Sequence, residues 1–215
     1  MSKAICVMGE SGSGKTTAMR TLDPATTYYI DCDKKGLAWK GWRQQYNAEK
    51  KNFMADRDLA KIQTVLVGIS QKRPDIKTIV IDTLNTAMVD KEIKSMGDGS
   101  GYGKWIDLTQ YVWSICELAS VLRDDLTVIV SMHSETIRDD LGYNFTRIKT
   151  NGRKLEKVVL ESLFSTVLLA KKKDDGSHVF ETVAKQSTAK TPLGAFDSEE
   201  VPNDMAAVLK ALEDF

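Results

Sequence analysis

The sequence predicts an α/β fold, in which a mainly parallel sheet is flanked by helices and the chain ends in an antiparallel hairpin. Short apolar runs typical of buried strands alternate with longer segments whose apolar residues recur at helical spacing. Near the end of the chain, two strand-like runs flank an Asp175-Gly176 pair, which is a strong hairpin signal. Because no linker or repeat divides the sequence, we expect a single domain over residues 1–215.

Each element can be placed along the chain from its own pattern. Strands are predicted at residues 3–8, 26–31, 76–82 and 126–133. Helices are predicted at residues 16–23, 54–71 and 105–124, and from a cap at Asn203 or Asp204 onward. The helix over 54–71 has an apolar stripe formed by Leu59, Ile62, Leu66 and Ile69. Strands that alternate with helices in this way favour a parallel sheet.

Composition narrows the class of protein. The chain has 215 residues, 42% of them hydrophobic and 28% charged, which suits one globular domain with a sizeable core. Basic and acidic residues both number 30, which excludes a globally basic nucleic-acid binder but allows a local basic patch. Three cysteines lack metal-ligand spacing and are expected to be reduced and buried. The sequence shows no signal peptide and no long apolar run, so we expect a cytoplasmic protein without a membrane partner.

A phosphate-binding loop follows the first predicted strand. The run GESGSGKTTA fits the pattern G-x-x-x-x-G-K-[ST] between a strand and a helix. Its residues are Gly9, Glu10, Ser11, Gly12, Ser13, Gly14, Lys15, Thr16 and Thr17. Lys15 is expected to reach the β- and γ-phosphates, and the Thr16 hydroxyl to ligate Mg²⁺. ATP and Mg²⁺ are therefore the expected cofactors, and the lack of a guanine-reading N-K-x-D motif favours adenine without deciding it.

Polar residues end three other predicted strands, where ligands of open α/β sheets bind. Asp82 ends the run TIVID and is predicted to act on Mg²⁺ together with Thr16. Asp31 and Asp33 follow a strand predicted to lie beside the phosphate loop, and one of them is expected to orient and deprotonate the attacking water. We favour Asp33, although a solvated turn in which Asp33 caps the following helix is the alternative. His133 is expected to sense the γ-phosphate, unless it is a structural histidine.

Taken in chain order, the phosphate loop, YIDCD, TIVIDT and VIVSMH resemble the core of RecA-like recombinases. The whole chain is similar to small phage-encoded RecA-like ATPases of the single-strand annealing and recombination type. This resemblance implies a RecA-like P-loop core with Asp33 as the catalytic carboxylate, Asp82 as the Mg²⁺ aspartate and His133 as the polar sensor. Two positions depart from RecA itself, which has glutamate in place of Asp33 and glutamine in place of His133.

The resemblance assigns DNA contact to two segments, which are otherwise ordinary solvated loops. A glycine-rich loop over residues 94–105 lies where the first DNA-binding loop of RecA-like proteins falls, and a basic loop over residues 143–157 lies just past His133. Cations beside aromatic rings hold single strands without reading their sequence. The predicted DNA-binding residues are Lys94, Tyr102, Lys104, Trp105, Arg147, Lys149, Arg153 and Lys154. ATP at His133 is expected to bias the loop behind it through an order–disorder change.

The resemblance also implies self-association. Late-strand lysines of RecA-like filaments reach the ATP of the neighbouring subunit, and Lys190, with Lys185 as the alternative, matches that location. A ring or a filament is therefore expected, with single-stranded DNA and a single-strand-binding protein as partners. The location would be the host-cell cytoplasm if the protein is phage-encoded.

The predicted function is a DNA-stimulated ATPase that binds single-stranded DNA in phage-type recombination or annealing. Two alternatives remain open. A nucleotide or small-molecule kinase shares the phosphate loop, although the sequence has no Arg-dense lid. A regulatory ATP-binding protein with little turnover is the other. Filament versus ring, and annealing versus strand exchange, are not decided by the sequence.

Overall fold

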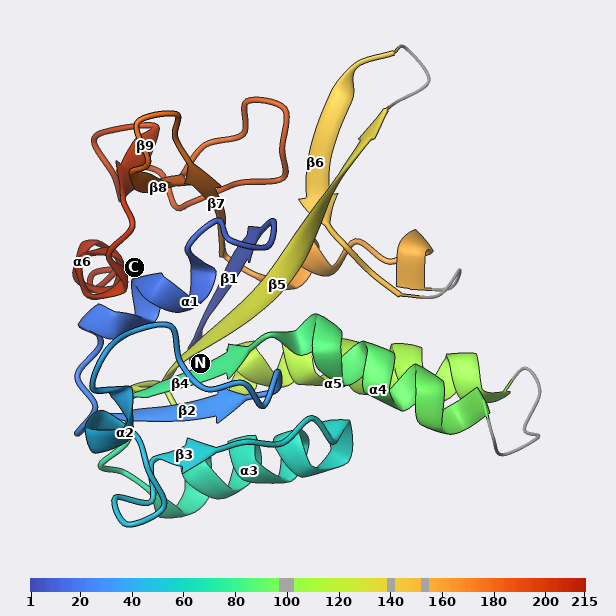
Figure 1. The fold of residues 1–215 in the computed structure, drawn as a ribbon, viewed down its shortest axis with the longest axis vertical. Coiled ribbons are helices and arrows are strands. Elements are labelled where there is room, and N and C mark those ends of the chain that lie inside the picture. The colour runs from blue at the N-terminus through green and yellow to red at the C-terminus, as the bar shows by residue number, and fades with distance from the viewer. Residues whose placement is uncertain (97–102, 139–141, 152–154) are drawn as a thin grey trace.

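A nine-stranded sheet lies at the centre of the fold in the computed structural model, which describes residues 1–96, 103–138, 142–151 and 155–215 (Figure 1). The strands are β1 (Lys3–Gly9), β2 (Thr27–Asp31), β3 (Phe53–Met54), β4 (Thr78–Asp82), β5 (Thr127–Arg138), β6 (Asn144–Ile148), β7 (Thr166–Lys172), β8 (His178–Glu181) and β9 (Glu200–Pro202). Their order is β3-β2-β4-β5-β1-β7-β8-β9, and β6 pairs with β5 outside this path.

Helices cover both faces of the sheet (Figure 1). The α-helices are α1 (Lys15–Ala18), α2 (Trp42–Gln45), α3 (Leu59–Lys72), α4 (Leu84–Met96), α5 (Gly103–Val121) and α6 (Met205–Ala211). The 3-10 turns are η1 (Met19–Thr21), η2 (Leu155–Lys157) and η3 (Leu160–Leu163). Helices α3, α4 and α5 bury their apolar sides in one core, and α1 and α6 pack in a second core on the opposite face.

The fold class predicted from the sequence is confirmed. Strands β3, β2, β4, β5, β1 and β7 run parallel, and β8 and β9 add antiparallel pairs at the end of the chain. The hairpin turn lies at Gly176, whose φ of 85° is readily adopted only by glycine. Asp204 caps α6 by accepting the backbone N–H of Ala207 at 3.0 Å, as expected.

The two cores decide which side chains can meet at the site. Successive strand residues point to opposite faces, so Val128 and Val130 of β5 enter the α3–α5 core while Ile129 enters the α1 core. By the same alternation, Ser131 and His133 fall on the α1 face. Val80 of β4 also lies in the α1 core, which places Asp82 on that face too.

The prediction that the strand ending in Asp31 lies beside the phosphate-loop strand is wrong. Two strands, β4 and β5, stand between β2 and β1. Parallel neighbours are joined by crossovers, so chain order does not decide which strands pair. The register still aligns the carboxyl ends, with Gly9 opposite His133 and Asp31 opposite Asp82.

Two predicted helices differ in extent from those observed. The first is helical only from Lys15 to Ala18 and continues as η1 to Thr21, because Leu22 is extended before Asp23 and Pro24. The helix expected from residue 54 begins at Leu59, after Asp58 accepts the backbone N–H of Lys61 as an N-cap. Its predicted apolar stripe is buried.

The first part of the basic segment predicted as a loop is one strand of a β-ribbon. Strand β5 continues past His133 to Arg138, and β6 returns antiparallel beside it, with Glu135 opposite Arg147. The ribbon carries polar and charged residues on both sides, a composition that sequence patterns assign to loops. Likewise Lys94 lies in α4, and Lys104 and Trp105 lie in α5, so both ends of the segment predicted as a glycine-rich loop are helical; residues 97–102 lie outside the described residues.

Candidate functional site

The phosphate loop leaves β1 with little room for side chains. A Cβ on Gly9 would lie 2.5 Å from the Ser13 hydroxyl and 2.8 Å from the Ala170 carbonyl oxygen. Gly12 and Gly14 have φ values of 81° and 98°, in the left-handed region that favours glycine. The strand therefore turns back through a tight loop whose backbone is accessible, and such a loop suits an anion more than a packed side chain.

Lys15 arches back over this loop. Its ammonium donates to the carbonyls of Gly9 and Glu10, both at 2.8 Å, and lies 3.5 Å from Nδ1 of His133. Burial lowers the pKa of Lys15 to about 8, with the charge of Asp82 opposing the shift. A phosphate group bound at the loop would supply a negative charge beside this ammonium. The geometry therefore fits the phosphates of a nucleoside triphosphate.

Three hydroxyl groups surround the carboxylate of Asp82. Thr16 and Tyr29 donate to its Oδ2 at 2.7 and 2.6 Å, and Thr83 donates to its Oδ1 at 3.1 Å. Burial and the charge of Asp82 raise the pKa of Tyr29 well above its ordinary value, so the phenol remains a donor. The described residues contain no cluster of acidic, histidine or cysteine side chains able to cage a metal. A hydroxyl, a carboxylate and substrate phosphates are nevertheless the ligands typical of Mg²⁺, and the pair Thr16 and Asp82 fits that ion.

Asp31 and Asp33 have different surroundings. Asp31 is buried and accepts the backbone N–H groups of Lys34 and Gly36 at 2.9 and 2.8 Å, which folds the chain after β2 into a turn. Asp33 instead accepts the hydroxyl of Thr86 on one oxygen and the ammonium of Lys35 on the other. The geometry thus gives Asp31 a structural role in the turn.

The pKa values of the two aspartates shift in opposite directions. Burial raises the pKa of Asp31, although its two backbone hydrogen bonds oppose the shift. Burial also opposes ionisation of Asp33, but the hydrogen bonds from Lys35 and Thr86 outweigh it and hold the pKa of Asp33 below its ordinary value. Asp33 is therefore ionised at neutral pH and oriented, as the predicted water-positioning role requires.

His133 is tied to two other elements through its backbone. Its N–H donates to the side-chain oxygen of Asn85 at 2.7 Å, and its carbonyl accepts the N–H of Lys149 at 2.8 Å. Asn85 in turn donates to the carbonyl of Lys149 at 2.7 Å. Burial, and then the charge of Lys15, lower the pKa of His133, so its imidazole is neutral at pH 7.

Sequence reasoning missed four residues of this site: Tyr29, Lys35, Asn85 and Thr86. Tyr29 stands two residues before Asp31, so strand alternation places both on the same face of the sheet. The sequence does not reveal the partner of Tyr29, because Asp82 lies on another strand. Asn85 and Thr86 follow the Asp82 strand directly, and their position near a predicted metal site was the available signal.

The predicted DNA-binding residues do not form one surface in the described part of the chain. Lys94 pairs with Asp90 at 2.6 Å on α4, and Arg147 pairs with Glu135 at 2.9 Å on the ribbon. The side chain of Lys149 is exposed. Tyr102, Arg153 and Lys154 lie outside the described residues, as do the side chains of Lys104 and Trp105.

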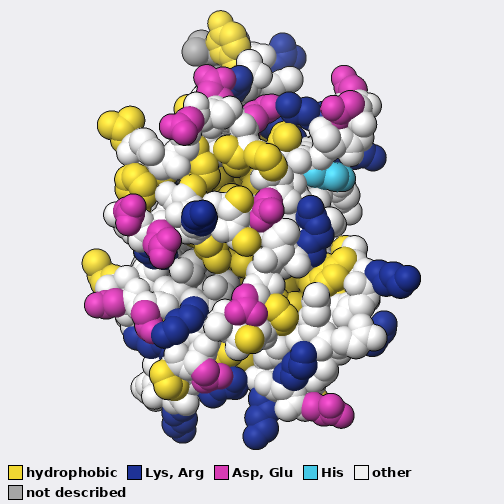
Figure 2. All heavy atoms as spheres, turned by 90° about the vertical axis from the view of Figure 1, so that its left-hand side faces the viewer, with side chains coloured by type: hydrophobic (Ala, Val, Ile, Leu, Met, Phe, Trp, Pro, Cys, Tyr) yellow, Lys and Arg dark blue, Asp and Glu magenta, His cyan; other side chains and the backbone are white. Residues whose placement is uncertain are grey.

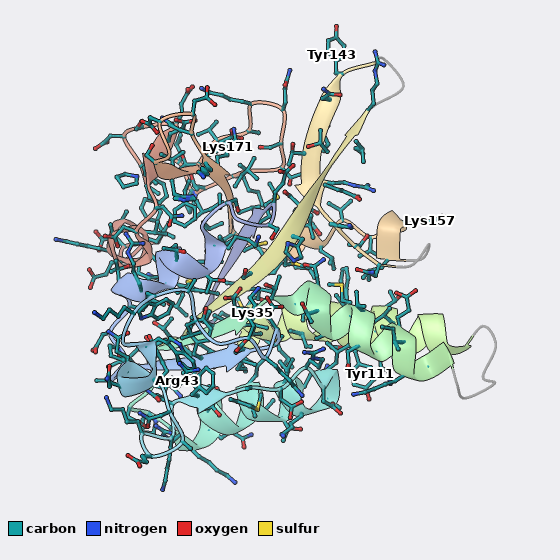
Figure 3. The ribbon with its side chains drawn as sticks, viewed as in Figure 1. Lys35, Arg43, Tyr111, Tyr143, Lys157 and Lys171 are labelled. Atoms are coloured by element: carbon teal, nitrogen blue, oxygen red, sulfur yellow. The ribbon has the colours of Figure 1, made fainter. Side chains whose placement is uncertain are left out.

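The outer end of the ribbon carries an exposed aromatic residue. Figure 3 shows Tyr143 there, pointing away from the body of the molecule, and Tyr143 is 65% exposed. Lys157 lies at the side of the molecule, near the base of the ribbon (Figure 3). On the face that carries α6 and α2, basic and acidic side chains are interspersed, so that face has no broad basic surface (Figure 2).

Of the two lysines predicted to act in trans, Lys190 lies away from the carboxyl edge of the sheet and Lys185 is already paired. Lys190 exchanges both backbone hydrogen bonds with Val167, at 2.7 and 2.9 Å, and Val167 stands opposite Cys6 in the middle of β1. Lys185 pairs with Glu199 at 2.6 Å, and both side chains are exposed. A role for either lysine at the nucleotide of another subunit stays a prediction.

Comparison with known families decides the class of this site. A family model described as an AAA domain matches residues 1–193, which include the phosphate loop and every catalytic position discussed above. This chain belongs to the AAA domain family. Membership supports nucleotide binding and NTPase activity at the P-loop, for which Mg²⁺ is the usual metal. The search of curated proteins found no match to the chain.

A cavity of about 540 Å³ adjoins the phosphate loop of this AAA domain. Its walls are the loop residues 10–13, the β5–β6 ribbon and the end of β7, so the ribbon and the nucleotide site share a boundary. Across the described ranges of the AAA domain, helices fall short of the length and apolar character needed to cross a membrane.

Proposed function

We propose that the chain is a Mg²⁺-dependent ATPase whose turnover is stimulated by single-stranded DNA bound along the β5–β6 ribbon, in recombination or annealing of the phage type. The observation that carries the proposal is the bridge made by Asn85. This buried amide bonds His133, beside the phosphate loop, and Lys149, at the base of the ribbon.

The chemical roles follow from the contacts at the site. Lys15 exchanges its two carbonyl contacts for phosphate oxygens, and the loop N–H groups bind the same anion. Thr16 and Asp82 would hold Mg²⁺, which neutralises charge on the phosphates when bound. Asp33 orients the attacking water and accepts its proton. Tyr29 and Thr86 keep the two carboxylates in place through their hydroxyl groups.

A short chain of contacts connects the phosphate loop to the base of the ribbon. His133 lies 3.5 Å from the Lys15 ammonium, so a γ-phosphate bound by Lys15 would also lie close to the imidazole. A shift of His133 would be passed through Asn85 to the carbonyl of Lys149, because one buried side chain makes both hydrogen bonds. Breaking either bond would leave a polar group of the buried Asn85 amide without its partner, so the two segments are expected to move together.

Binding of DNA at the ribbon is supported by its chemistry. Lys149 is exposed, and Tyr143 offers a ring on which a base can stack. The Arg147–Glu135 pair is partly exposed, and pairs of this kind are weak enough to exchange for a phosphate. Because the protein has no net charge, the electrostatic hold on DNA would be local and sensitive to salt.

Self-association into a ring or filament is part of the proposal. Lys190, or Lys185, would then complete the nucleotide site of a neighbouring subunit as a cation on the γ-phosphate. Hydrolysis per subunit would rise with protein concentration, and Lys190→Ala would remove that dependence. Turnover that is independent of concentration in both proteins would contradict a trans role for Lys190.

The test is steady-state release of phosphate from ATP with and without single-stranded DNA, with Lys15→Ala as the blank. Stimulation by DNA supports the proposal. Turnover indifferent to DNA would leave an ATPase and remove the DNA role. Transfer of phosphate to a nucleoside acceptor would instead indicate a kinase, and tight ATP binding without turnover a regulatory nucleotide-binding protein.

A further inference from the structure

Lys35 stands at the apex of a preformed turn. The carboxylate of Asp31 accepts the backbone N–H groups on either side of it, from Lys34 and Gly36. Lys34 and Gly36 have φ values of 56° and 81°, so the chain reverses sharply around Lys35. A buried aspartate that satisfies two backbone donors fixes such a turn. The position of the Lys35 backbone is therefore set by the fold.

Printed contacts aside, hydrogen bonds connect the Lys35 ammonium to the nucleotide site. It bonds Asp33, and Asp33 also accepts the hydroxyl of Thr86. Thr86 lies four residues after Asp82, the carboxylate that accepts the Thr16 hydroxyl of the phosphate loop. Figure 3 shows Lys35 near the middle of the molecule, close to the end of β4. Its neighbour Lys34 instead faces Asp56, 4.0 Å away.

The partner of Lys35 is the carboxylate predicted to position the attacking water. Its ammonium bonds one oxygen of Asp33, while Thr86 holds the other. The Lys35 side chain is 67% exposed and Asp33 only 11%, so the lysine is the partner that is free to move. If Lys35 left, Thr86 would still orient Asp33, and the freed oxygen could accept a proton from water.

We propose that Lys35 is a further catalytic residue, which supplies a cation to the γ-phosphate from within the same chain. Without nucleotide, its ammonium neutralises Asp33; with a triphosphate bound, it moves to the γ-phosphate and exposes Asp33 to water. A terminal phosphate carries more negative charge than one carboxylate and attracts the ammonium more strongly. This inference rests on the proposed ATPase function and adds a cation in cis to that site.

The first test is equilibrium binding of a slowly hydrolysed ATP analogue, ATPγS, and of ADP, each with Mg²⁺. Lys35→Gln is expected to weaken ATPγS about ten- to hundredfold, the range of a charge-assisted hydrogen bond, and to leave ADP affinity within about twofold. The matched control is Lys34→Gln, which removes a charge from the same turn and should change neither affinity. Equal losses for both nucleotides, or no loss, would overturn the proposal.

A second variant separates contact with phosphate from simple neutralisation of Asp33. In an Asp33→Asn background, removing Lys35 should still weaken ATPγS if the ammonium touches the γ-phosphate. If Lys35 only shields the phosphate from Asp33, the Lys35→Gln change will have no effect in that background, and the proposal fails. Comparing the effect of Lys35→Gln on ATPγS affinity in the wild-type and Asp33→Asn backgrounds separates contact with the phosphate from neutralisation of Asp33. The comparison is needed because Lys35 and Asp33 are in direct contact.

Mixing experiments test whether the cation acts in cis. Lys35→Gln subunits mixed with Lys15→Ala subunits should release phosphate no faster than Lys35→Gln subunits alone, because a cis residue cannot be supplied by a neighbour. Recovered phosphate release in the mixture would overturn the proposal. The binding assay does not need hydrolysis, so a wild-type protein without turnover would contradict the ATPase function while still testing Lys35. A wild-type protein that bound neither nucleotide would overturn both.

Discussion

The side-chain oxygen of Asn85 accepts the backbone N–H of His133 at 2.7 Å. Asn85 is only 4% exposed, and its amide nitrogen bonds the carbonyl of Lys149 at the same distance. One side chain thereby joins the start of α4, the middle of β5 beside the phosphate loop and the chain just after β6. A shared element of this kind is one physical route by which a nucleotide site and a separate surface can be coupled.

Asn85→Ala is expected to lower the free energy of unfolding by about 1–3 kcal/mol, because it removes two partly buried hydrogen bonds, each worth about 0.5–1.5 kcal/mol. It should also abolish DNA stimulation while basal hydrolysis remains. Urea unfolding and phosphate release measure the two effects. Asn85→Asp is the matched comparison, since it keeps an acceptor for His133 but loses the donor to Lys149. Full DNA stimulation in Asn85→Ala would contradict the coupling.

Tyr29→Phe removes one of the three hydroxyl groups around Asp82. Because the lost hydrogen bond goes to a buried charge, we expect a loss of roughly 1.5–3 kcal/mol in stability and a higher Mg²⁺ requirement for hydrolysis. Urea unfolding and Mg²⁺ titration of turnover provide the measurements. Tyr28→Phe on the same strand is the control, and an equal effect in the two variants would show that the Asp82 contact is not the cause.

The two aspartates after β2 should respond differently to amide substitution. Asp33→Asn is expected to lower kcat by about 10²- to 10⁴-fold with little change in stability or ATP binding, as for loss of a general base. Asp31→Asn should mainly lower stability, because its carboxylate holds the turn. Kinetics and unfolding on both variants distinguish them, and the reverse pattern would move the base to Asp31.

Stability should depend on pH through His133. The folded chain lowers the pKa of this imidazole, so the unfolded chain binds the proton first as the pH falls below about 6.5. The free energy of unfolding therefore decreases on acidification through this window and levels off below the folded pKa. Urea unfolding between about pH 7.5 and 5.5 measures the slope. His133→Gln should flatten this slope, and an unchanged slope in that variant would count against the partly buried imidazole as its cause.

Lys149→Gln should weaken binding of single-stranded DNA and leave ATP affinity unchanged. Loss of one phosphate contact is expected to reduce the slope of log affinity against log salt by about 0.7. Fluorescence anisotropy with a labelled oligonucleotide at several salt concentrations gives that slope. Lys72→Gln, an exposed lysine at the end of α3, is the control. An identical slope in the wild type and Lys149→Gln would remove Lys149 from the DNA surface.

Features specified by short contiguous patterns could be predicted from the sequence. The phosphate loop, the apolar run that ends in Asp82, the hairpin at Gly176 and the Asp204 cap each depend on a few neighbouring residues. Strand order could not be predicted, because β5 separates β1 from β4 through pairings between distant segments. The ribbon was missed because polar residues such as Glu135 and Arg147 carry no strand signal until they face each other.

The same distinction holds within the site. Lys15, Thr16 and Asp82 could be assigned because their roles follow from a motif and a strand end. The contacts of Tyr29, Asn85 and Lys35 depend on side chains brought together by the fold. Tyr29 and Asp82, for example, meet across two strands that pair only through the register of the sheet.

The central claim is that the phosphate loop and the ribbon are coupled. Nucleotide-dependent binding of single-stranded DNA tests it most directly, because it measures how a nucleotide at the loop changes DNA affinity at the ribbon. We would measure the affinity for a labelled oligonucleotide with Mg²⁺ and ATPγS, with Mg²⁺ and ADP, and without nucleotide, in the wild type and in Asn85→Ala. The account predicts tightest binding with ATPγS in the wild type and no nucleotide dependence in Asn85→Ala. Equal affinity in all three states of the wild type, or no DNA binding at all, would contradict it.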